Sequence, residues 1–374
     1  MTATAIPGVG AGVPGATFVY VSNADDGDIS TYLLEPSGTL RPGARAKAAT
    51  RVGPMVVSPD RRFLYAASRS EPYTIHVYAV DRGTGVLTPA STSPLAESLP
   101  YISLDRTGRF LLGASYAAGV VIVSAVGTDG RVGSEPLQVI PVGRNAHSIG
   151  VDRSNQFAYV PTLGSDAVFM FRFDGNTGKL ASNTPAIRLT KPGAGPRHFV
   201  ISGDNRFVFV LCEMTGTIVT FALDGRTGLL SETGSVSGLS PDSTLVPGAP
   251  RGGPTTRNLE RDIWAADIHV TPNGKFLYTS ERTDSTLNAF RIDDATGNLT
   301  YLSSVPTERQ PRGFAIDPSG LFLIATGEKS ETISLYAIDA ASGALDLRNR
   351  YPNGNGANWV EIISFDLPTA TSSK

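Results

Sequence analysis

The sequence contains one cysteine, Cys212, among 374 residues, so it cannot form an intrachain disulfide. Proteins that depend on disulfides fold mostly in oxidising compartments, and this scarcity favours a reducing one. No apolar stretch approaches the roughly 18 residues that a membrane-spanning helix needs. The first residues also lack the basic and apolar segments of a secretory signal. We therefore expect a soluble protein of the cytoplasm.

The sequence also lacks a strong charge of either sign. Its formal net charge is −2 and its pI is near 6.1. Electrostatic attraction to nucleic acid or to an anionic membrane is therefore not expected. No GxSxG, HExxH, P-loop or EF-hand pattern occurs, and no cluster of side chains has metal-ligand spacing. We expect no metal and no cofactor.

A repeat dominates what is present. A phenylalanine follows a polar turn in six segments: Phe63, Phe110, Phe157, Phe207, Phe276 and Phe322. These residues are spaced by 46 to 50 positions, apart from one spacing of 69. A Gly-containing hairpin turn recurs between them, at 35–38, 81–85, 128–130, 174–178, 224–228, 293–297 and 339–343. Seven turns indicate seven units.

Each unit has room for four strands, and four-stranded units at this period are typical of a β-propeller. The alternative, a parallel solenoid, usually has shorter repeats. The N-terminal unit lacks an innermost strand, whereas 359–365 forms an orphan strand at the other end. We expect this orphan to pair with 18–23 and close the ring. The predicted fold is an all-β, seven-bladed propeller over 17–366, with tails at 1–16 and 367–374.

The long spacing falls at 239–263, a Pro- and Gly-rich connection between the fifth and sixth blades. Loops of this length are commonly either functional or loosely structured. A lid over one mouth of the central channel and a tolerated surface insertion are both open interpretations.

Two positions in each repeat are predicted to lie at that same mouth. The position ten before the marker phenylalanine begins the innermost strand, and the position six after it ends the next strand. Together they carry His147, Arg197, Glu213, Arg282, Arg312 and Glu328, with Gln310 and Lys329 beside them. Arginines, carboxylates and a histidine at one mouth predict a cationic pocket for a small anion, with groups that can move protons. Polar lining of a wet channel is the plainer alternative.

The remaining histidines and the cysteine are expected to be structural. His76 and His269 lie in strand patterns, and Cys212 ends the apolar run VFVLC. His198 follows Arg197 in its strand, so alternation predicts that it points away from the mouth.

Several stretches resemble the seven-bladed lactonase family, which contains propeller-type bacterial 6-phosphogluconolactonases and a fungal carboxymuconate-lactonizing enzyme. They are AHS (146–148), GPRHFV (195–200), CEMTG (212–216), IHVTPNGKFLYTSERTDSTLNAF (268–290), QPRGFAIDPSG (310–320) and GEKSETISLY (327–336). The resemblance covers 17–365. It implies that His147, Arg197, Glu213 and Arg282 correspond to the His, Arg, Glu and second Arg of the fungal branch.

The resemblance leaves three functional hypotheses. The first, favoured by the bacterial-type motifs, is hydrolysis of 6-phospho-D-glucono-1,5-lactone to 6-phosphogluconate in the pentose phosphate pathway. Glu213 or His147 would activate water, Arg197 would stabilise the oxyanion, and Arg282, Arg312, Gln310 and Lys329 would bind the substrate. The second hypothesis is a carboxymuconate cycloisomerase, and the third is a non-catalytic binding propeller. The expected partner is an anionic small-molecule lactone, and the expected assembly is a monomer or weak homo-oligomer.

Overall fold

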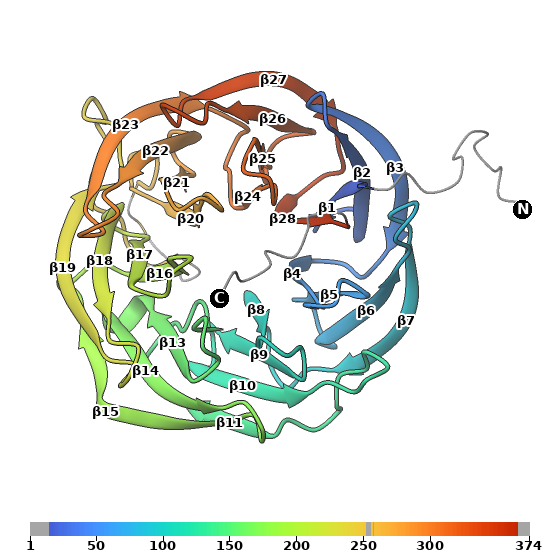
Figure 1. Ribbon diagram of the computed structural model, residues 1–374, viewed down its shortest axis with the longest axis horizontal. Coiled ribbons are helices and arrows are strands. Elements are labelled where there is room, and N and C mark those ends of the chain that lie inside the picture. Colours follow the sequence, from blue (N-terminus) through green and yellow to red (C-terminus); the bar gives the residue numbers. More distant parts are fainter. Residues whose placement is uncertain (1–14, 252–255, 257, 366–374) are drawn as a thin grey trace, which may run out of the picture.

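A ring of seven antiparallel sheets, each of four strands, forms the computed structural model, which describes residues 15–251, 256 and 258–365 (Figure 1). The predicted seven-bladed propeller is confirmed. One short 3₁₀ turn, η1 (Leu163–Ser165), is the only helical element of the part described. No helix in that part is long and apolar enough to cross a membrane.

The four strands of each blade lie side by side, from the channel outward to the rim of the ring. Blade 1 contains β28 (Ala357–Ser364), β1 (Thr17–Asn23), β2 (Asp28–Glu35) and β3 (Thr39–Lys47); blade 2 contains β4 (Val52–Val57), β5 (Phe63–Ser68), β6 (Thr74–Val80) and β7 (Leu87–Pro94). Blade 3 contains β8 (Tyr101–Leu104), β9 (Phe110–Ser115), β10 (Val120–Ala125) and β11 (Gln138–Pro141); blade 4 contains β12 (Gly150–Val151), β13 (Phe157–Thr162), β14 (Ala167–Asp174) and β15 (Lys179–Leu189). Blade 5 contains β16 (Pro196–Ile201), β17 (Phe207–Cys212), β18 (Thr217–Leu223) and β19 (Leu230–Ser237); blade 6 contains β20 (Ala265–Val270), β21 (Phe276–Glu281), β22 (Thr286–Ile292) and β23 (Leu299–Pro306). Blade 7 contains β24 (Phe314–Ile316), β25 (Phe322–Ala325), β26 (Thr332–Ile338) and β27 (Leu345–Pro352).

The ring closes inside blade 1, as predicted from the orphan strand. Strand β28 pairs antiparallel with β1, so that Trp359 lies opposite Ser22 and Ile363 lies opposite Phe18. Of the predicted tails, only Gly15 and Ala16 are among the described residues. Ala16 is buried, and its carbonyl oxygen accepts a hydrogen bond from the Phe365 amide at 3.1 Å. The ordered packing therefore includes Ala16.

The marker phenylalanines and the hairpin glycines of the sequence repeat meet at the blade interfaces. Each glycine has a positive φ, and a Cβ placed on it would lie 2.1 to 2.8 Å from the phenylalanine ring of the preceding blade. The pairs are Phe18–Gly85, Phe63–Gly130, Phe110–Gly178, Phe157–Gly228, Phe207–Gly297, Phe276–Gly343 and Phe322–Gly38. The last pair joins blade 7 to blade 1, so the same contact continues around the closed ring.

One innermost strand is shorter than predicted, and another has an irregular register. Strand β12 begins at Gly150, three residues after His147, the position at which the sequence pattern placed its start. Strand β16 begins at Pro196, one residue before its predicted start at Arg197, and the register shifts between Pro196 and His198. This shift is a β-bulge, and it changes which side chains reach the channel.

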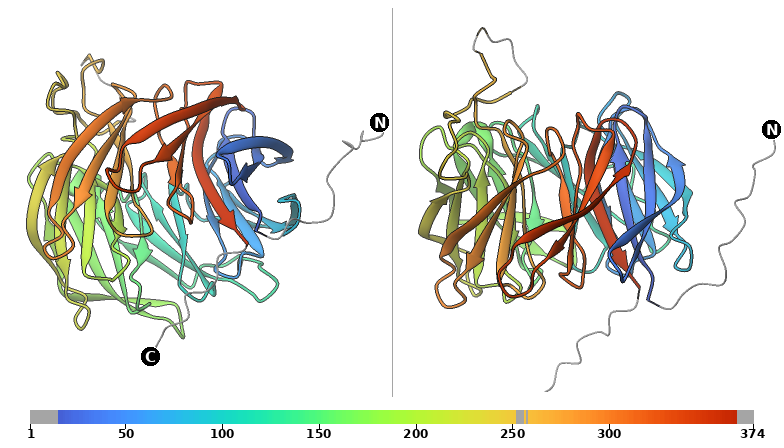
Figure 2. Two further views of the ribbon diagram at one scale, coloured as in Figure 1. Left: turned by 45° about the horizontal axis from the view of Figure 1, so that its top comes forward. Right: turned by 90° about the horizontal axis from the view of Figure 1, so that it is seen from above.

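The described part of the connection between β19 and β20 projects from one end of the ring (Figure 2). It returns to the blades by backbone hydrogen bonds. The Gly248 amide donates to the Met214 carbonyl oxygen at 2.7 Å, and the Ile263 amide donates to the Val246 carbonyl oxygen at 2.9 Å. The segment therefore lies against the residue that follows Glu213.

Candidate active site

Arg197, Glu213 and Arg282 form a buried ion triplet. Arg197 Nε donates to Glu213 Oε2 at 2.7 Å, and Arg282 Nη2 donates to the same oxygen at 2.8 Å. The side chains are 0%, 5% and 1% exposed, respectively. The sequence placed Arg197 and Glu213 side by side at one mouth, and the structure brings them into direct contact.

Local strand pairing explains this contact. Strands β16 and β17 are antiparallel neighbours, so the start of one lies beside the end of the other. Pro196 pairs with Cys212, which places Arg197 and Glu213 at the same edge. Arg282 follows β21 in the same way in the next blade. Its Nε donates to the Trp264 carbonyl oxygen at 3.0 Å, which fixes the chain against β20.

Arg197 is not fully satisfied in this arrangement. Its Nη1 donates to the Ala266 carbonyl oxygen, whereas Nη2 is buried and has no hydrogen-bond partner in the described part of the chain. Burial and the neighbouring Arg282 and Arg312 hold the Arg197 pKa well below its usual value, against the opposing effect of Glu213. An unpaired donor in a cationic environment is suited to an incoming anion.

A second polar group lies beside the triplet. Arg312 Nε is 3.9 Å from Glu328 Oε1, and Gln310 Nε2 donates to Glu328 Oε2 at 2.9 Å. Arg312 and Glu328 keep 14% and 24% of their side chains exposed, so this group is the accessible part of the site. Lys329 is exposed, and no side-chain contact joins it to the others within the described residues.

Arg69, which follows β5 as Arg282 follows β21, also belongs to this group. Burial lowers its pKa to about 10, with the nearby Arg312 and Arg51 acting in the same direction. Its Nε is buried and unpartnered in the described part. Arg69, Arg197, Arg282 and Arg312 stand against Glu213 and Glu328, so four positive and two negative charges leave a net +2.

His147 lies at the edge of the triplet in contact with Tyr116. The two rings meet edge to face with centroids 5.7 Å apart. The His147 pKa is held well below its usual value, first by burial and then by Arg197, His198, Arg312 and Arg282. The imidazole is therefore neutral at pH 7 and can accept a proton. Its Nδ1 is buried without a partner in the described part, whereas Nε2 is not among such buried nitrogens.

The β19–β20 connection reaches this site. Tyr116 donates from its hydroxyl to the Arg251 carbonyl oxygen at 3.3 Å, which links blade 3 to the connection. Two guanidiniums stack on the Trp264 indole, with the Cζ atoms of Arg282 and Arg251 at 3.7 and 4.3 Å from the ring centroid. Such stacking orients Arg282 at the buried triplet. Trp264 was not identified in the sequence.

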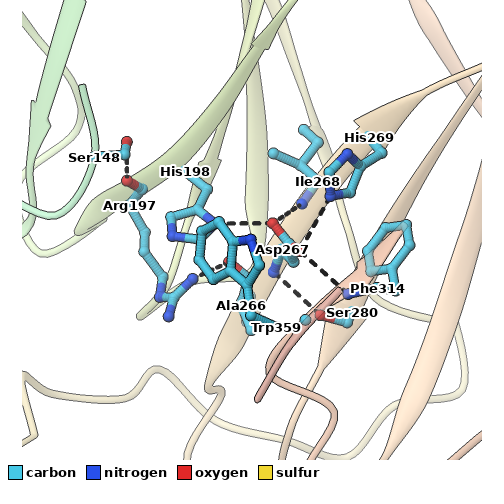
Figure 3. A network of polar contacts seen from close by, with 12 residues as sticks. Ser148, Arg197, His198, Ala266, Asp267, Ile268, His269, Ser280, Phe314 and Trp359 are labelled. Atoms are coloured by element: carbon cyan, nitrogen blue, oxygen red, sulfur yellow. Dashed lines mark hydrogen bonds and ion pairs between the residues drawn. The ribbon is translucent and has the colours of Figure 1, made fainter. Parts of the chain in front are cut away.

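The sequence interpretation of His198 was wrong, because its side chain does not point away from the site. Its ring is buried among channel residues, with centroids 5.1 Å from His147, 5.0 Å from Tyr101 and 6.1 Å from Trp359. The bulge at Arg197 breaks the alternation on which the prediction relied. Figure 3 shows Asp267 between His198 and His269.

Asp267 holds both histidines. His198 Nδ1 is 2.8 Å from Asp267 Oδ1, and His269 Nε2 is 3.1 Å from Asp267 Oδ2. Asp267 sits one position after the predicted rim position of its repeat, as do His198 and Tyr101 in theirs. The sequence could have indicated this channel group through the polar residues one position after the rim position.

Two cavities occupy the channel beyond this group. One of about 200 Å³ is lined by His198, Asp267, His269, Trp359, Glu361 and Tyr101, among others. A second of about 420 Å³ shares Tyr101 and Phe199 with it and extends to Asp105, Arg106 and Arg153. The buried arginines of the triplet border neither cavity.

The remaining candidates have structural surroundings. Cys212 is fully buried, and burial raises its thiol pKa to about 12, which agrees with an inert role. His76 is partly buried in β6 of blade 2, whereas the triplet belongs to blades 5 and 6. No group of three or more His, Cys, Asp or Glu residues suited to a metal ion occurs in residues 15–251, 256 and 258–365.

Comparison with known proteins assigns the chain to a family. The family model "Lactonase, 7-bladed beta-propeller" matches residues 17–362. The chain is 36% identical over 348 residues to the 6-phosphogluconolactonase of Pectobacterium carotovorum, covering 93% of this chain and 99% of that one. It is 38% identical over 346 residues to the 6-phosphogluconolactonase of Serratia proteamaculans, covering 92% and 98%.

A solved structure agrees on the fold. The periplasmic gluconolactonase of Pseudomonas aeruginosa superimposes with a TM-score of 0.81 at 24% identity, covering 93% of this chain and 99% of that one. The family match extends over all seven blades, including the closing strand up to residue 362. The chain belongs to the seven-bladed β-propeller lactonase family.

Proposed function

We propose that this protein hydrolyses 6-phospho-D-glucono-1,5-lactone to 6-phosphogluconate, a step of the pentose phosphate pathway. The observation that carries the proposal is the buried Arg197, whose Nη2 has no partner in the described part, at the centre of a site with net charge +2. The substrate carries a phosphate, and hydrolysis generates an oxyanion. Relatives at 36–38% identity bear the name of this activity.

The geometry supports a division of roles. Arg312 and Gln310 are the accessible groups, so they would contact the phosphate first. Arg282 is buried in the triplet and would add its positive charge from behind them. Arg197 would donate to the carbonyl oxygen as it becomes an oxyanion during attack by water. Lys329 could join phosphate binding only by turning in from the surface.

The base is assigned to His147 or Glu213, and two contacts bear on the choice. Glu213 Oε2 already accepts from two arginines, which makes Glu213 the group that holds them in place. His147 is neutral, and within the described residues no hydrogen bond engages its Nε2. It would take the proton from water as the oxygen attacks the carbonyl carbon and return it to the departing ring oxygen.

The test is a direct assay with freshly generated 6-phosphogluconolactone, its unphosphorylated analogue and a carboxymuconate. We expect kcat/KM to be highest for the phosphorylated lactone. A preference for the muconate would support a cycloisomerase, and no turnover of any of the three would support a binding propeller.

Arg312→Ala makes the assay specific for the phosphate. Losing a hydrogen bond to a charged group costs about 1.5–3 kcal/mol, which corresponds to roughly ten- to a hundredfold in kcat/KM. The loss should be confined to the phosphorylated lactone. Arg309→Ala is the matched control, because Arg309 is an exposed arginine three positions away. Equal losses on both lactones would contradict a phosphate-binding role.

We further propose that the protein acts in the cytoplasm as a monomer or weak homo-oligomer, without nucleic acid or a membrane as partner. The single buried cysteine supports the choice of compartment, and the net charge of −2 supports the absence of nucleic acid and an anionic membrane as partners. Fractionation and size-exclusion chromatography would test it.

A further inference from the structure

The ring of His198 presents one bare nitrogen to its surroundings. Asp267 accepts four hydrogen bonds: from His198 Nδ1 at 2.8 Å, His269 Nε2 at 3.1 Å, and the Ile268 and Phe314 amides at 3.0 and 3.3 Å. Burial opposes ionisation of Asp267, but His269 and His198 hold its pKa well below the usual value. An ionised carboxylate only accepts, so His198 Nδ1 carries the proton.

The other nitrogen of His198 is then a lone pair. Burial, followed by Arg197, lowers the His198 pKa to about 3, so the ring is neutral and has a single proton. That proton is on Nδ1, which leaves Nε2 bare. The Nε2 atom is buried and has no hydrogen-bond partner in the described residues.

Within the described residues His147 also has an unpartnered ring nitrogen, and its ring contacts that of His198. The two rings are in edge-to-face contact, with centroids 5.1 Å apart and planes at 67°. His147 Nδ1 is likewise buried and unpartnered in the described part of the chain. A proton on His147 Nδ1 would be attracted by the bare nitrogen of His198, whereas a bare Nδ1 would place a second lone pair in the same buried surroundings.

We infer that His198, held by Asp267, is a positioning residue that keeps His147 in its Nδ1–H tautomer, so that His147 Nε2 is the basic nitrogen of the site. Figure 3 shows the Asp267–His198 side of this arrangement. The inference rests on the proposed function only for its kinetic consequence, because the tautomer exists with or without a substrate.

The proposal defines the path of the proton during hydrolysis. Water forms the new C–O bond as it gives one proton to His147 Nε2, and the positive charge on the ring is shared with Nδ1–H, which the His198 lone pair would stabilise. The C–O bond to the ring oxygen then breaks, and that oxygen takes the proton from Nε2. His147 returns to its neutral state, and no other reactant is required.

Nitrogen-15 NMR of histidine-labelled protein tests the tautomer directly. The chain has four histidines, so each ring can be assigned by substitution. At pH 7 we expect Nδ1–H with a bare Nε2 for both His147 and His198. A proton on Nε2 of His147 in the wild-type protein would overturn the inference, whatever the activity.

Asp267→Asn is the informative variant. An amide can donate to His198 Nδ1, which moves the His198 proton to Nε2 and in turn the His147 proton to its Nε2. We expect both rings to change tautomer and kcat to fall by roughly 10²–10⁴-fold, the usual contribution of a general base, while KM changes little. An unchanged His147 tautomer would mean that Asp267 only packs the channel.

A matched pair at position 198 covers the case in which Asp267→Asn fails to fold. His198→Gln can place a carbonyl oxygen near the position of Nε2 and so keep an acceptor for His147, whereas His198→Asn is too short to do so. We expect Gln to retain at least tenfold more kcat than Asn, with the His147 tautomer preserved only in Gln. Equal losses, or equal tautomers, would contradict the proposal.

His76→Gln is the control, because His76 is a partly buried histidine of β6 with an unpartnered Nε2 in the described part and no contact with the triplet. It should leave kcat and both tautomers unchanged. If the wild-type protein turned over no lactone, the proposed function would fail, and the tautomer measurements would still decide this inference.

Discussion

At the residue scale, the site depends on a carboxylate shared by two buried arginines. Glu213 Oε2 accepts from Arg197 and Arg282 at 2.7 and 2.8 Å. Removing one member of a buried ion group leaves an uncompensated charge, which is far more costly than losing an exposed pair. Glu213 therefore has a structural role even before any part in catalysis is considered.

Glu213→Gln should lower the stability of the protein by about 3–5 kcal/mol, because the amide leaves two buried guanidiniums without a counter-charge. The measurement is chemical denaturation of purified protein. Asp346→Asn is the control, since Asp346 pairs with Arg348 at 3.3 Å where the two side chains are 71% and 54% exposed. It should cost less than about 1 kcal/mol. Equal effects of the two substitutions would contradict the buried triplet.

The protonation of His147 gives a second prediction at this scale. Its pKa is held well below the usual value by burial first, and then by Arg197, His198, Arg312 and Arg282. If neutral His147 is the base, the acid limb of kcat/KM, which reports the free enzyme, should lie well below pH 6.5. A bound phosphate offsets the arginine charges, so the acid limb of kcat should lie at higher pH.

Initial rates between about pH 4.5 and 8, corrected for uncatalysed lactone hydrolysis, would measure both limbs. Arg312→Ala removes one of the charges that lower the His147 pKa, so it should move the kcat/KM limb upward. An acid limb of kcat/KM at or above about 6.5 in the wild-type protein would exclude His147 as the base.

At the element scale, a bulge decides what the sequence could predict. Pairing of β16 with β17 placed Arg197 beside Glu213, and antiparallel geometry alone was sufficient for that. The extra residue in β16 lets Arg197 and His198 both lie inside, whereas strict alternation predicts one of them outside. A bulge cannot be recognised in a single sequence, so the position of His198 was predicted wrongly. Trp264 and Arg251 were missed because irregular connections have no periodicity to follow.

The blade interfaces show the opposite case, in which the sequence repeat identified most of the residues that meet. The same Phe–Gly contact occurs seven times, and all seven glycines and six of the seven phenylalanines were visible as regularly spaced markers, Phe18 being the exception. Their contact across blades needed the structure, because the repeat does not say which blade each turn packs against. A Cβ on Gly228 would lie 2.1 Å from the Phe157 ring, and Gly228 has a φ of 70°.

Gly228→Ala should therefore destabilise the protein by about 2–5 kcal/mol. The left-handed backbone contributes about 1–2 kcal/mol and the clash with the ring about 1–3 kcal/mol. Gly225→Ala is a control within the same turn, because nothing lies within 4 Å of a Cβ there. It should change stability by no more than about 0.5 kcal/mol. Thermal and urea denaturation measure both variants, and comparable losses would contradict the interblade contact.

At the scale of the whole molecule, the ring closes around a channel whose centre is polar. Strand β28, which completes blade 1, brings Trp359 and Glu361 to the cavity that Asp267 and His269 line from blade 6. The Trp359 indole donates to Glu361 Oε1 at 2.9 Å. The closing strand therefore brings a carboxyl group close to the ionised Asp267 across the channel.

Glu361 makes the stability of the closed ring depend on pH. Burial raises its pKa to about 7, with a smaller contribution from Asp267 in the same direction. In the unfolded chain this carboxyl is ionised above about pH 5. The native state thus holds a proton that the unfolded state lacks, so its stabilising contribution is complete at low pH and is lost as pH rises through 7. Between pH 6 and 8 the loss from this group should be about 1.4 kcal/mol.

Glu361→Gln separates this effect from the other titrations of the chain. The amide oxygen can still accept from the Trp359 indole, but position 361 no longer titrates. Urea denaturation at pH 6 and pH 8 should show that the wild-type protein loses about 1 kcal/mol more than the variant does over this interval. The variant should also be the more stable of the two at pH 8, where the wild-type carboxylate is charged beside Asp267. An identical loss in both proteins would mean that Glu361 is already ionised in the closed ring at pH 6.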